Sequence, residues 1–371
     1  MYDAIIIGGG ASGVMCAIVA SERKKKILLI DSDIYPAKKL MLTGNGRCNL
    51  TNINMSSDYF NQNIDDFFSR FGEKDALRFF EKLGLVTYVD EEGRVYPYSR
   101  SARSVVDVLN AKLKGNKVEV KTCEKVMALD RKNDMFEVTT DKGKYLSEKV
   151  VVATGTFLEN KFLKGLGFSE FRPSLCALKS ESTKKLSGIR LSDVEVTAKC
   201  NGKMKKDKGE VLFKDDGLSG IVIFNISSIF ARENSYNGEI SLNLMPNYTK
   251  PNLKAMITSR LNDGIDLFKG WFQDEVASLI LKKAKVEKIN KSSIDKIVDA
   301  ITDMRFEIKG FYPNNQIFAG GISLDDLTKN LESKSINGLY FTGEVIDVDG
   351  ECGGYNLQWA WTSGFVVGEN L

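Results

Sequence analysis

A glycine-rich segment near the N-terminus has the residue types and spacing that bind a dinucleotide. Gly8-Gly9-Gly10-Ala11-Ser12-Gly13 fits the pattern G-x-G-x-x-G, directly after an Ile-rich strand pattern and directly before a helix pattern. Gly8 permits a tight turn, Gly10 lets the backbone approach a pyrophosphate, and Gly13 lets helix and strand pack closely. The helix N-terminus adds free N–H groups and a positive dipole, so the segment is predicted to hold a nucleotide phosphate.

An acidic residue completes this unit. Asp31 ends the next strand pattern, 18 residues after Gly13, close to the ~20 residues expected for a carboxylate that accepts hydrogen bonds from a ribose. The following residues of the unit are therefore expected to contact the cofactor: Gly8, Gly10, Ala11, Ser12, Gly13, Asp31 and Ser32.

The position of the motif bears on which dinucleotide is bound. The motif alone fits FAD and NAD equally, but its place at the start of the chain favours FAD, because the FAD unit usually comes first in two-nucleotide flavoproteins. A second complete motif is missing, since Gly44-Asn45-Gly46 and Gly165-Leu166-Gly167 lack a third glycine at the right spacing. We therefore predict no dedicated nicotinamide domain.

Two further segments are more specific than the glycine motif. Segment 38–52 contains Gly44-Asn45-Gly46-Arg47-Cys48-Asn49, and segment 338–361 contains Gly343-Glu344 and Gly353-Gly354-Tyr355-Asn356-Leu357. With Arg94-Val95-Tyr96-Pro97 and Asp216-Gly217-Leu218-Ser219-Gly220, they resemble the BaiN-like FAD-dependent oxidoreductases, a family that includes proteins described as aminoacetone oxidases. The resemblance spans nearly the whole chain. One departure is Ile221, where the family often has proline.

The resemblance implies an α/β architecture in three parts. These are a Rossmann-like FAD-binding domain of residues 1–174 and 320–371, an inserted β-barrel-like substrate domain of residues 175–250 and 304–319, and a small helical domain of residues 251–303. Shifts in composition near Leu175, Pro251 and Gly320 agree with these boundaries. The strand-like pieces expected in the β domain include Ile221-Val222-Ile223-Phe224, and Lys203 to Lys208 is expected at a hairpin tip.

The chemistry of these segments suits a flavin. The loop from Gly44 to Asn49 offers closely spaced backbone N–H groups and the Arg47 guanidinium. Gly353-Gly354 precedes the last helix pattern, whose N-terminus can face the N1 and O2 side of a flavin and stabilise negative charge there. The further expected cofactor contacts are Lys39, Leu42, Gly44, Gly46, Arg47, Cys48, Asn49, Val126, Ala153, Thr154, Gly155, Gly343, Glu344, Gly353, Gly354, Tyr355, Asn356 and Leu357. The candidates for the substrate side are Asn45, Arg47 and Tyr355.

The composition excludes several kinds of catalysis. The chain has no histidine, which rules out Ser-His-Asp hydrolysis and H-E-x-x-H metal sites. Its six cysteines form no C-x-x-C pair, and Cys48 is expected to pack rather than react. Asp347, Asp349 and Glu351 lack the register of a calcium loop, so no metal site is predicted.

Charge and hydropathy bear on partners and location. The chain carries 52 basic and 49 acidic residues, a net charge of +3, so a nucleic-acid partner is not expected. The run Arg23 to Lys26 falls where the first helix should end, and is interpreted as a solvated helix end. No apolar run approaches the ~20 residues of a membrane span, and the expected location is the cytoplasm. The oligomeric state is left open.

Three classes of function remain. The leading hypothesis is an FAD-dependent oxidoreductase that transfers hydride between flavin N5 and a small organic substrate, with NAD(P)H as a transient donor that reduces a polarised double bond. Within the same class, an oxygen-dependent oxidase of small amines is the alternative. A flavin-dependent RNA-modifying enzyme and a flavin-bound redox sensor are alternatives of other classes. The substrate, the electron donor or acceptor and the proton donor stay open.

Overall fold

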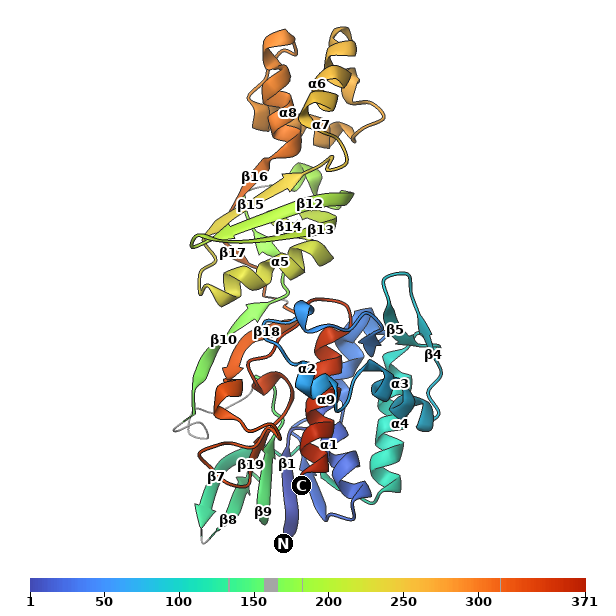
Figure 1. Ribbon diagram of the computed structural model, residues 1–371, viewed down its shortest axis with the longest axis vertical. Coiled ribbons are helices and arrows are strands. Elements are labelled where there is room, and N and C mark those ends of the chain that lie inside the picture. Colours follow the sequence, from blue (N-terminus) through green and yellow to red (C-terminus); the bar gives the residue numbers. More distant parts are fainter. Residues whose placement is uncertain (133, 157–165, 182, 314) are drawn as a thin grey trace. The chain divides into compact units, whose positions relative to one another are not determined.

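The computed structural model describes residues 1–132, 134–156, 166–181, 183–313 and 315–371 (Figure 1). The chain divides into two compact units, one of Met1–Phe171 with Ala319–Leu371 and the other of Arg172–Phe318. It passes between them within β10 (Phe168–Ser174) and β18 (Ile317–Ile322), which pair with each other. A separate helical domain within the second unit stays a prediction.

The first unit is built on a seven-stranded sheet with the order β6-β2-β1-β9-β8-β7, in which β19 also pairs with β9. The strands are β1 (Tyr2–Ile7), β2 (Ile27–Ile30), β6 (Glu119–Lys121), β7 (Val126–Lys132), β8 (Met135–Thr140), β9 (Lys144–Val152) and β19 (Leu339–Phe341). The pairs among β6, β2, β1, β9 and β19 are parallel, and β8 and β7 add an antiparallel edge. The apolar runs of β1 and β2 suit strands that are covered on both faces.

Helices from both ends of the chain pack beside each other on this sheet. Helix α1 (Ala11–Glu22) lies against α9 (Tyr355–Glu369), as Figure 1 shows in blue and red. Glycines permit the approach, because a β-carbon at Gly364 would overlap the carbonyl oxygen of Ser12, and one at Gly368 would lie 2.8 Å from Cβ of Val19. The C-terminal segment thus completes the N-terminal unit.

The remaining elements of the first unit flank this pair of helices. The apolar residues of segments 75–83 and 102–113 recur at the spacing of one helix face, which predicts a helix in each, and the structure confirms both as α3 (Glu73–Lys82) and α4 (Ala102–Gly115). Trp359 and Trp361 of α9 are both buried, and their indole N–H groups donate to the carbonyls of Gly343 and Leu50. The other elements are α2 (Asp65–Phe68), α3 (Glu73–Lys82), α4 (Ala102–Gly115), β3 (Thr51–Asn52), β4 (Thr87–Val89), β5 (Arg94–Pro97) and the 3-10 turns η1 (Lys38–Gly46), η2 (Ser57–Tyr59), η7 (Leu324–Asp326) and η8 (Gly343–Val345).

The second unit contains an antiparallel sheet with the order β16-β15-β12-β13-β14-β11-β17. Its strands are β11 (Leu178–Lys179), β12 (Arg190–Cys200), β13 (Lys203–Lys214), β14 (Gly217–Ser219), β15 (Gly238–Asn243), β16 (Met304–Ile308) and β17 (Gly310–Phe311). The two edge strands, β16 and β17, are separated in the chain by Lys309 alone. One continuous segment therefore joins both edges, which curves the sheet into a barrel-like form.

Two expectations for this unit were wrong. The segment from Ile221 begins helix α5 (Ile221–Arg232) and not a strand, because the apolar residues continue at helical spacing through Val222, Ile226 and Ile229. The hairpin tip is Asn201-Gly202, both with positive φ, and the lysines from Lys203 onward lie in β13. Asn-Gly is the usual pair for such a two-residue turn.

Three helices follow β15 and precede β16. They are α6 (Lys250–Ser259), α7 (Asp274–Ala284) and α8 (Ile294–Thr302), accompanied by the 3-10 turns η5 (Leu261–Phe268) and η6 (Lys291–Ser293), while η4 (Lys184–Leu186) follows β11. Pro251 lies in the first turn of α6, as predicted for a helix start. Helix α8 packs against both α6 and α7.

Candidate functional site

Four parallel strands of the first unit end at one edge of the sheet. In register, Ile7 of β1 lies opposite Ile30 of β2 and Val152 of β9, and Phe341 of β19 also lies opposite Val152. The residues that follow these strands are Gly8, Asp31, Ala153 and Thr342. Ligands of open α/β sheets bind outside the carboxyl ends of the strands, so this edge is the candidate site.

The glycine loop is shaped by close backbone contacts. Gly8 has a φ of +105°, and a β-carbon there would overlap the carbonyl of Ala153. A β-carbon at Gly13 would overlap the carbonyl oxygen of Gly8, so helix and strand touch at that point. At Gly10, by contrast, a β-carbon would meet nothing within 4 Å. The space beside Gly10 is therefore open, and its occupation by a pyrophosphate stays a prediction.

Asp31 organises the same loop. One carboxylate oxygen accepts a hydrogen bond from the Gly9 amide at 2.6 Å, and the other accepts one from the Asp33 amide at 2.8 Å. The carboxylate is thus fixed at the end of β2. Its contact with a ribose stays a prediction, and each oxygen retains a second lone pair for that contact.

The last residues of η1 and those that follow it, segment 44–49, form a second wall beside β5. Gly44, Asn45 and Cys48 all have positive φ. Arg47 stacks over the Tyr96 ring, with the guanidinium carbon 4.7 Å from the ring centre, and its Nε donates to the carbonyl of Gly44 at 3.3 Å. Cys48 is fully buried, and burial raises the pKa of its thiol to about 12. This thiol is therefore neutral and packed.

The N-terminus of α9 meets that wall. A β-carbon at Gly354, the residue before the helix, would overlap the backbone of Thr51 and would lie 2.8 Å from Oδ1 of Asn49. No side chain caps this helix. The side-chain amide of Asn356 holds the preceding loop by bonding both the N–H and the carbonyl of Gly350 at 2.8 Å, and its contact with a cofactor stays a prediction.

Two buried oxygens in these walls have no hydrogen-bond partner in the described part of the chain. They are Oδ1 of Asn49 and Oγ1 of Thr154, and Asn49 is only 9% exposed. Native proteins rarely leave such atoms unpaired, because the loss costs about 1–3 kcal/mol each. Both lie in segments that the sequence assigns to the cofactor. The residues present therefore fit a bound dinucleotide with hydrogen-bonding groups along its length.

Tyr355 belongs to an aromatic cluster at the first residue of α9. Its ring stacks on Tyr59 with centres 4.5 Å apart and meets Phe60 edge to face at 6.0 Å. Its side chain is hydrogen-bonded to Tyr59, and burial, with the neighbouring Tyr59, raises the pKa of its hydroxyl. Tyr59 is partly exposed, so the pair reaches from the helix end to the surface.

The segment that carries Tyr59 was not among the site residues predicted from the sequence. Asn61 binds the segment before α9 through the Asp349 amide and carbonyl, and Gln62 donates to the carbonyl of Asp347 at 2.6 Å. Thr51 likewise donates to Gln358 of α9 at 2.7 Å inside the unit. The only signal in the sequence was the pair Tyr59-Phe60 near polar amides, which fits many loops equally well.

The other predicted contacts are distributed along the same edge. Ser12 donates to the carbonyl of Thr342, and Gly343 donates to Ser363, so α1 and η8 are joined. Gly155 lies near the Glu344 carboxylate, which would be 3.4 Å from a β-carbon there. Leu42 and Asn45 are exposed. The remaining predicted contacts lie at these places: Ala11 opens α1, Ser32 is exposed after β2, Lys39 and Gly46 belong to η1, Val126 opens β7, and Gly353 and Leu357 flank the start of α9.

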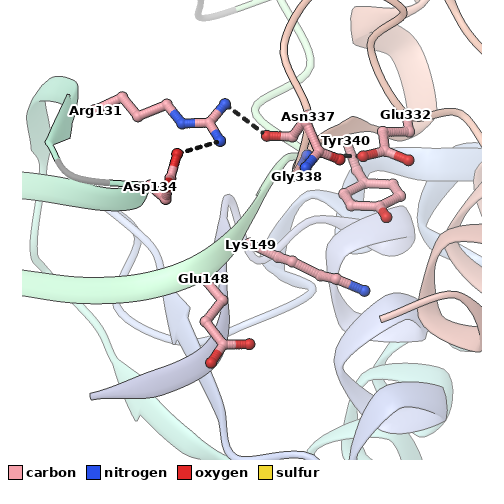
Figure 2. A pocket seen from close by; sticks show the side chains of 8 residues that line it. All are labelled: Arg131, Asp134, Glu148, Lys149, Glu332, Asn337, Gly338 and Tyr340. Atoms are coloured by element: carbon pink, nitrogen blue, oxygen red, sulfur yellow. Dashed lines mark hydrogen bonds and ion pairs between the residues drawn. The ribbon is translucent and has the colours of Figure 1, made fainter.

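A hollow of about 580 Å³ lies elsewhere on the first unit, as Figure 2 shows. Its lining includes Gly338, directly before β19, and so belongs to the amino edge of the sheet. Its charged groups are held internally: Arg131 donates to the Asn337 carbonyl, Glu332 accepts from the Gly338 amide, and Lys149 donates to the carbonyl of Leu371. These contacts tie the C-terminus to the sheet, and we assign the hollow no role in binding the cofactor.

The described residues contain neither a candidate metal site nor a candidate membrane-spanning helix. Within the ranges that the structure describes, no group of three His, Cys, Asp or Glu side chains is placed to hold a metal ion. None of the described helices combines the length and the apolar character needed to cross a membrane.

The fold and the site define a class, that of FAD-dependent oxidoreductases with a Rossmann-like FAD-binding fold. The chain belongs to the family described as "HI0933-like protein Rossmann domain", which matches residues 2–370. It is therefore an FAD-dependent oxidoreductase and a flavoprotein, as the resemblance to the BaiN-like family predicted.

Curated relatives align with the chain over almost its full length. A "3-dehydro-bile acid delta(4,6)-reductase" of Clostridium scindens is 30% identical, covering 98% of this chain and 97% of the relative. A "Ribosomal RNA dihydrouridine synthase" of Escherichia coli is 27% identical, covering 100% and 98%. A protein of that same description from Haemophilus influenzae is also 27% identical, covering 97% and 96%.

Proposed function

We propose that this protein reduces a carbon–carbon double bond conjugated to a carbonyl, with NAD(P)H as the transient electron donor. The observation that carries the proposal is the unpartnered Asn49 oxygen beside the uncapped N-terminus of α9, because it supports a flavin end at that place. The names of the relatives support the substrate class. A delta(4,6)-reductase and a dihydrouridine synthase both add hydrogen to a ring double bond that is conjugated to a carbonyl.

The residues proposed to hold FAD follow from the three walls. The glycine loop and Asp31 hold the adenosine and phosphate end, the segment from Gly44 to Asn49 holds the middle, and the start of α9 holds the flavin. Bound FAD supplies hydride chemistry, since it can store two electrons from a nicotinamide and release them to a substrate. The positive end of the α9 dipole favours the negative charge that accompanies this reduction.

The reduction also needs a proton for the second carbon of the double bond. The chain has no histidine, and Cys48 is buried. We assign the proton to the Tyr355 hydroxyl, since it lies at the first residue of α9, where the flavin end is proposed, and its stacking partner Tyr59 reaches solvent, from which the proton can be replaced. Arg47 and Asn45 are proposed to orient the substrate carbonyl from the opposite wall.

Anaerobic bleaching of the flavin tests the proposal. The yellow protein is mixed with NADH, NADPH or aminoacetone while the flavin absorbance is followed, and a 3-oxo-4,6-diene steroid acid is then added. The proposal predicts that a nicotinamide bleaches the flavin and that the dienone restores the colour. Bleaching by aminoacetone instead, with colour restored by oxygen, would establish the amine-oxidase alternative.

A second candidate is the reduction of uridine in RNA, and a charge difference favours it. The second unit carries 24 Lys and Arg against 18 Asp and Glu, whereas the first carries 28 against 31. The net charge of the whole chain is near neutral although the second unit is basic. The whole-chain charge is therefore a weaker reason to expect no nucleic-acid partner. Two relatives bear a name that specifies ribosomal RNA. Restoration of the colour by uridine-containing RNA, and not by the dienone, would favour this candidate.

A further inference from the structure

A group of lysines surrounds the connection between α7 and α8. We call Lys282, Lys285, Lys288 and Lys291 the α7–α8 lysines; all four are exposed. They fall within ten residues, beginning in the last turn of α7 and ending at the first residue of η6. Between the first and last of them, Glu287 is the one acidic residue.

The acidic side chains of α8 and η5 form ion pairs with other residues. Asp295 and Asp299 of α8 form ion pairs with Lys254 and Lys250 of α6, each at 2.6 Å. Within η5 and its ends, Arg260 pairs with Asp263, and Lys269 pairs with Asp266. Among the described residues, none forms an ion pair with any of the α7–α8 lysines. No ion pair within the described part of the chain therefore compensates their positive charge.

A second basic segment of the same unit differs in this respect. On β13, Lys203 forms an ion pair with Glu233 at 2.5 Å, and Lys208 forms one with Asp193 at 2.8 Å. Lys205 donates a hydrogen bond to Ser228 at 3.1 Å. The two basic segments look alike in the sequence, but Lys203 and Lys208 of β13 form ion pairs, whereas in the described chain none of the α7–α8 lysines does.

The side chains around the α7–α8 lysines restrict the kind of molecule that can bind there. Lysines near the C-terminal end of α7 complement the helix dipole, but Lys288 and Lys291 lie beyond the last turn, where that effect has decayed. No large apolar side chain is exposed in the described segment 274–296, so the surface lacks the apolar contacts typical of membrane-bound helices and of protein interfaces. Repeated exposed cations without apolar neighbours suit a phosphate backbone.

We infer that the α7–α8 lysines are a docking surface for the phosphate backbone of RNA. The choice of RNA among polyanions rests on the second candidate of the proposed function, while the surface itself follows from the unpaired charges. The helical part of the second unit then has a role of its own: it binds the nucleic acid, apart from the chemistry of the first unit. Phosphate contacts of this kind give affinity and position without base specificity.

Binding of a fluorescein-labelled single-stranded 20-mer of mixed A and U, followed by anisotropy at several salt concentrations, tests the inference. The variant K282Q/K285Q/K288Q/K291Q is compared with K203Q/K205Q/K206Q/K208Q, which removes the same charge from β13. Each lost phosphate contact makes the slope of log binding constant against log salt concentration shallower by about 0.7. For the first variant this slope should become shallower by about 3, and binding at low salt should be at least ~10-fold weaker. The β13 variant should lose a slope of less than about 1.

A variant that is expected to bind RNA more tightly shows whether a loss of affinity in the quadruple variants comes from the lost charge or from misfolding. Glu287→Lys adds a fifth cation to the surface and should bind the 20-mer ~3-fold more tightly. Equal losses in the two quadruple variants, an unchanged affinity in Glu287→Lys, or no RNA binding by the wild type would each overturn the inference. Binding to phosphatidylserine vesicles without binding to RNA would assign the surface to membranes and overturn it as well. The flavin assay needs no RNA, so a failure of the proposed reductase chemistry is seen separately.

Discussion

Oδ1 of Asn49 lies 2.8 Å from the position that a β-carbon would take at Gly354. The two residues are some three hundred positions apart in the sequence, and their meeting joins the segment after η1 to the start of α9. The oxygen is buried and has no hydrogen-bond partner in the described chain. This pair of residues is therefore where we propose that the flavin end of the cofactor binds.

Asn49→Leu should change apoprotein stability and cofactor affinity in opposite directions. Leucine has the same number of side-chain heavy atoms and the same branching at Cγ, and it removes a buried unpaired acceptor, so the apoprotein should gain about 1 kcal/mol in its free energy of unfolding. The FAD dissociation constant should rise ~10-fold, because a hydrogen bond is lost. Urea unfolding of the apoprotein and fluorescence titration with FAD measure the two effects. A loss of stability without any loss of FAD affinity would show that Asn49 is only structural.

Gly10→Ala and Gly13→Ala form a matched pair in the glycine loop. A β-carbon at Gly10 meets nothing within 4 Å, so the apoprotein should keep its stability within ~0.5 kcal/mol, while FAD affinity falls at least ~10-fold because the methyl group enters the ligand space. A β-carbon at Gly13 overlaps the Gly8 carbonyl, so that variant should lose about 2–4 kcal/mol of stability without ligand. If Gly10→Ala binds FAD as well as wild type does, the assigned ligand space is wrong.

Tyr355→Phe tests the assignment of the proton. The ring and its stacking on Tyr59 are retained, so the fold and the bleaching of the flavin by NAD(P)H should not change. Return of colour with the dienone should slow by ~100-fold, since general acids contribute about that much. Stopped-flow absorbance separates the two steps. Equal rates of colour return in wild type and variant would leave Tyr355 with a packing role alone.

The buried thiol of Cys48 should make stability fall at alkaline pH. An unfolded cysteine titrates near pH 8.5, whereas burial raises the pKa of Cys48 to about 12 in the folded protein. Between these values the unfolded chain binds fewer protons than the folded chain, so the free energy of unfolding falls as pH rises, by up to ~1.4 kcal/mol per unit. Cys48→Ala should reduce that slope by up to ~1.4 kcal/mol per pH unit in urea titrations between pH 8 and 11, while the buried thiols of Cys16 and Cys176, whose pKa values are also raised, keep the remainder. The exposed Cys123→Ala is the control and should leave the slope in place.

Local signals predicted much of the first unit. The glycine motif, Asp31 and the helices from Asp75 and Ala102 follow from spacing alone, because strand and helix periods are set by the backbone. The strand predicted from Ile221 was wrong, because a β-branched run of four residues fits a strand and a helix equally well. The helical spacing becomes visible only in the residues that follow.

Long-range contacts could not be predicted in this way. Tyr59 stacks on Tyr355, and Asn61 binds Asp349, through pairings between segments far apart in the chain. Nothing in the composition near Tyr59 indicates such a partner. The ion pairs that neutralise Lys203 and Lys208, and the lack of such pairs at Lys288, likewise depend on tertiary neighbours that the sequence does not display.

We propose that FAD binds along the edge formed by the glycine loop, Asn49 and the start of α9, and takes electrons from a nicotinamide there. The most direct test is anaerobic addition of NADPH and NADH to the FAD-loaded protein, followed at the flavin absorbance band in wild type and in Asn49→Leu. We predict that one nicotinamide bleaches the wild-type flavin in a single turnover, and that the variant needs ~10-fold more FAD for the same bleached signal. A protein that stays colourless after FAD is added, or a yellow protein that neither nicotinamide bleaches, would contradict the account.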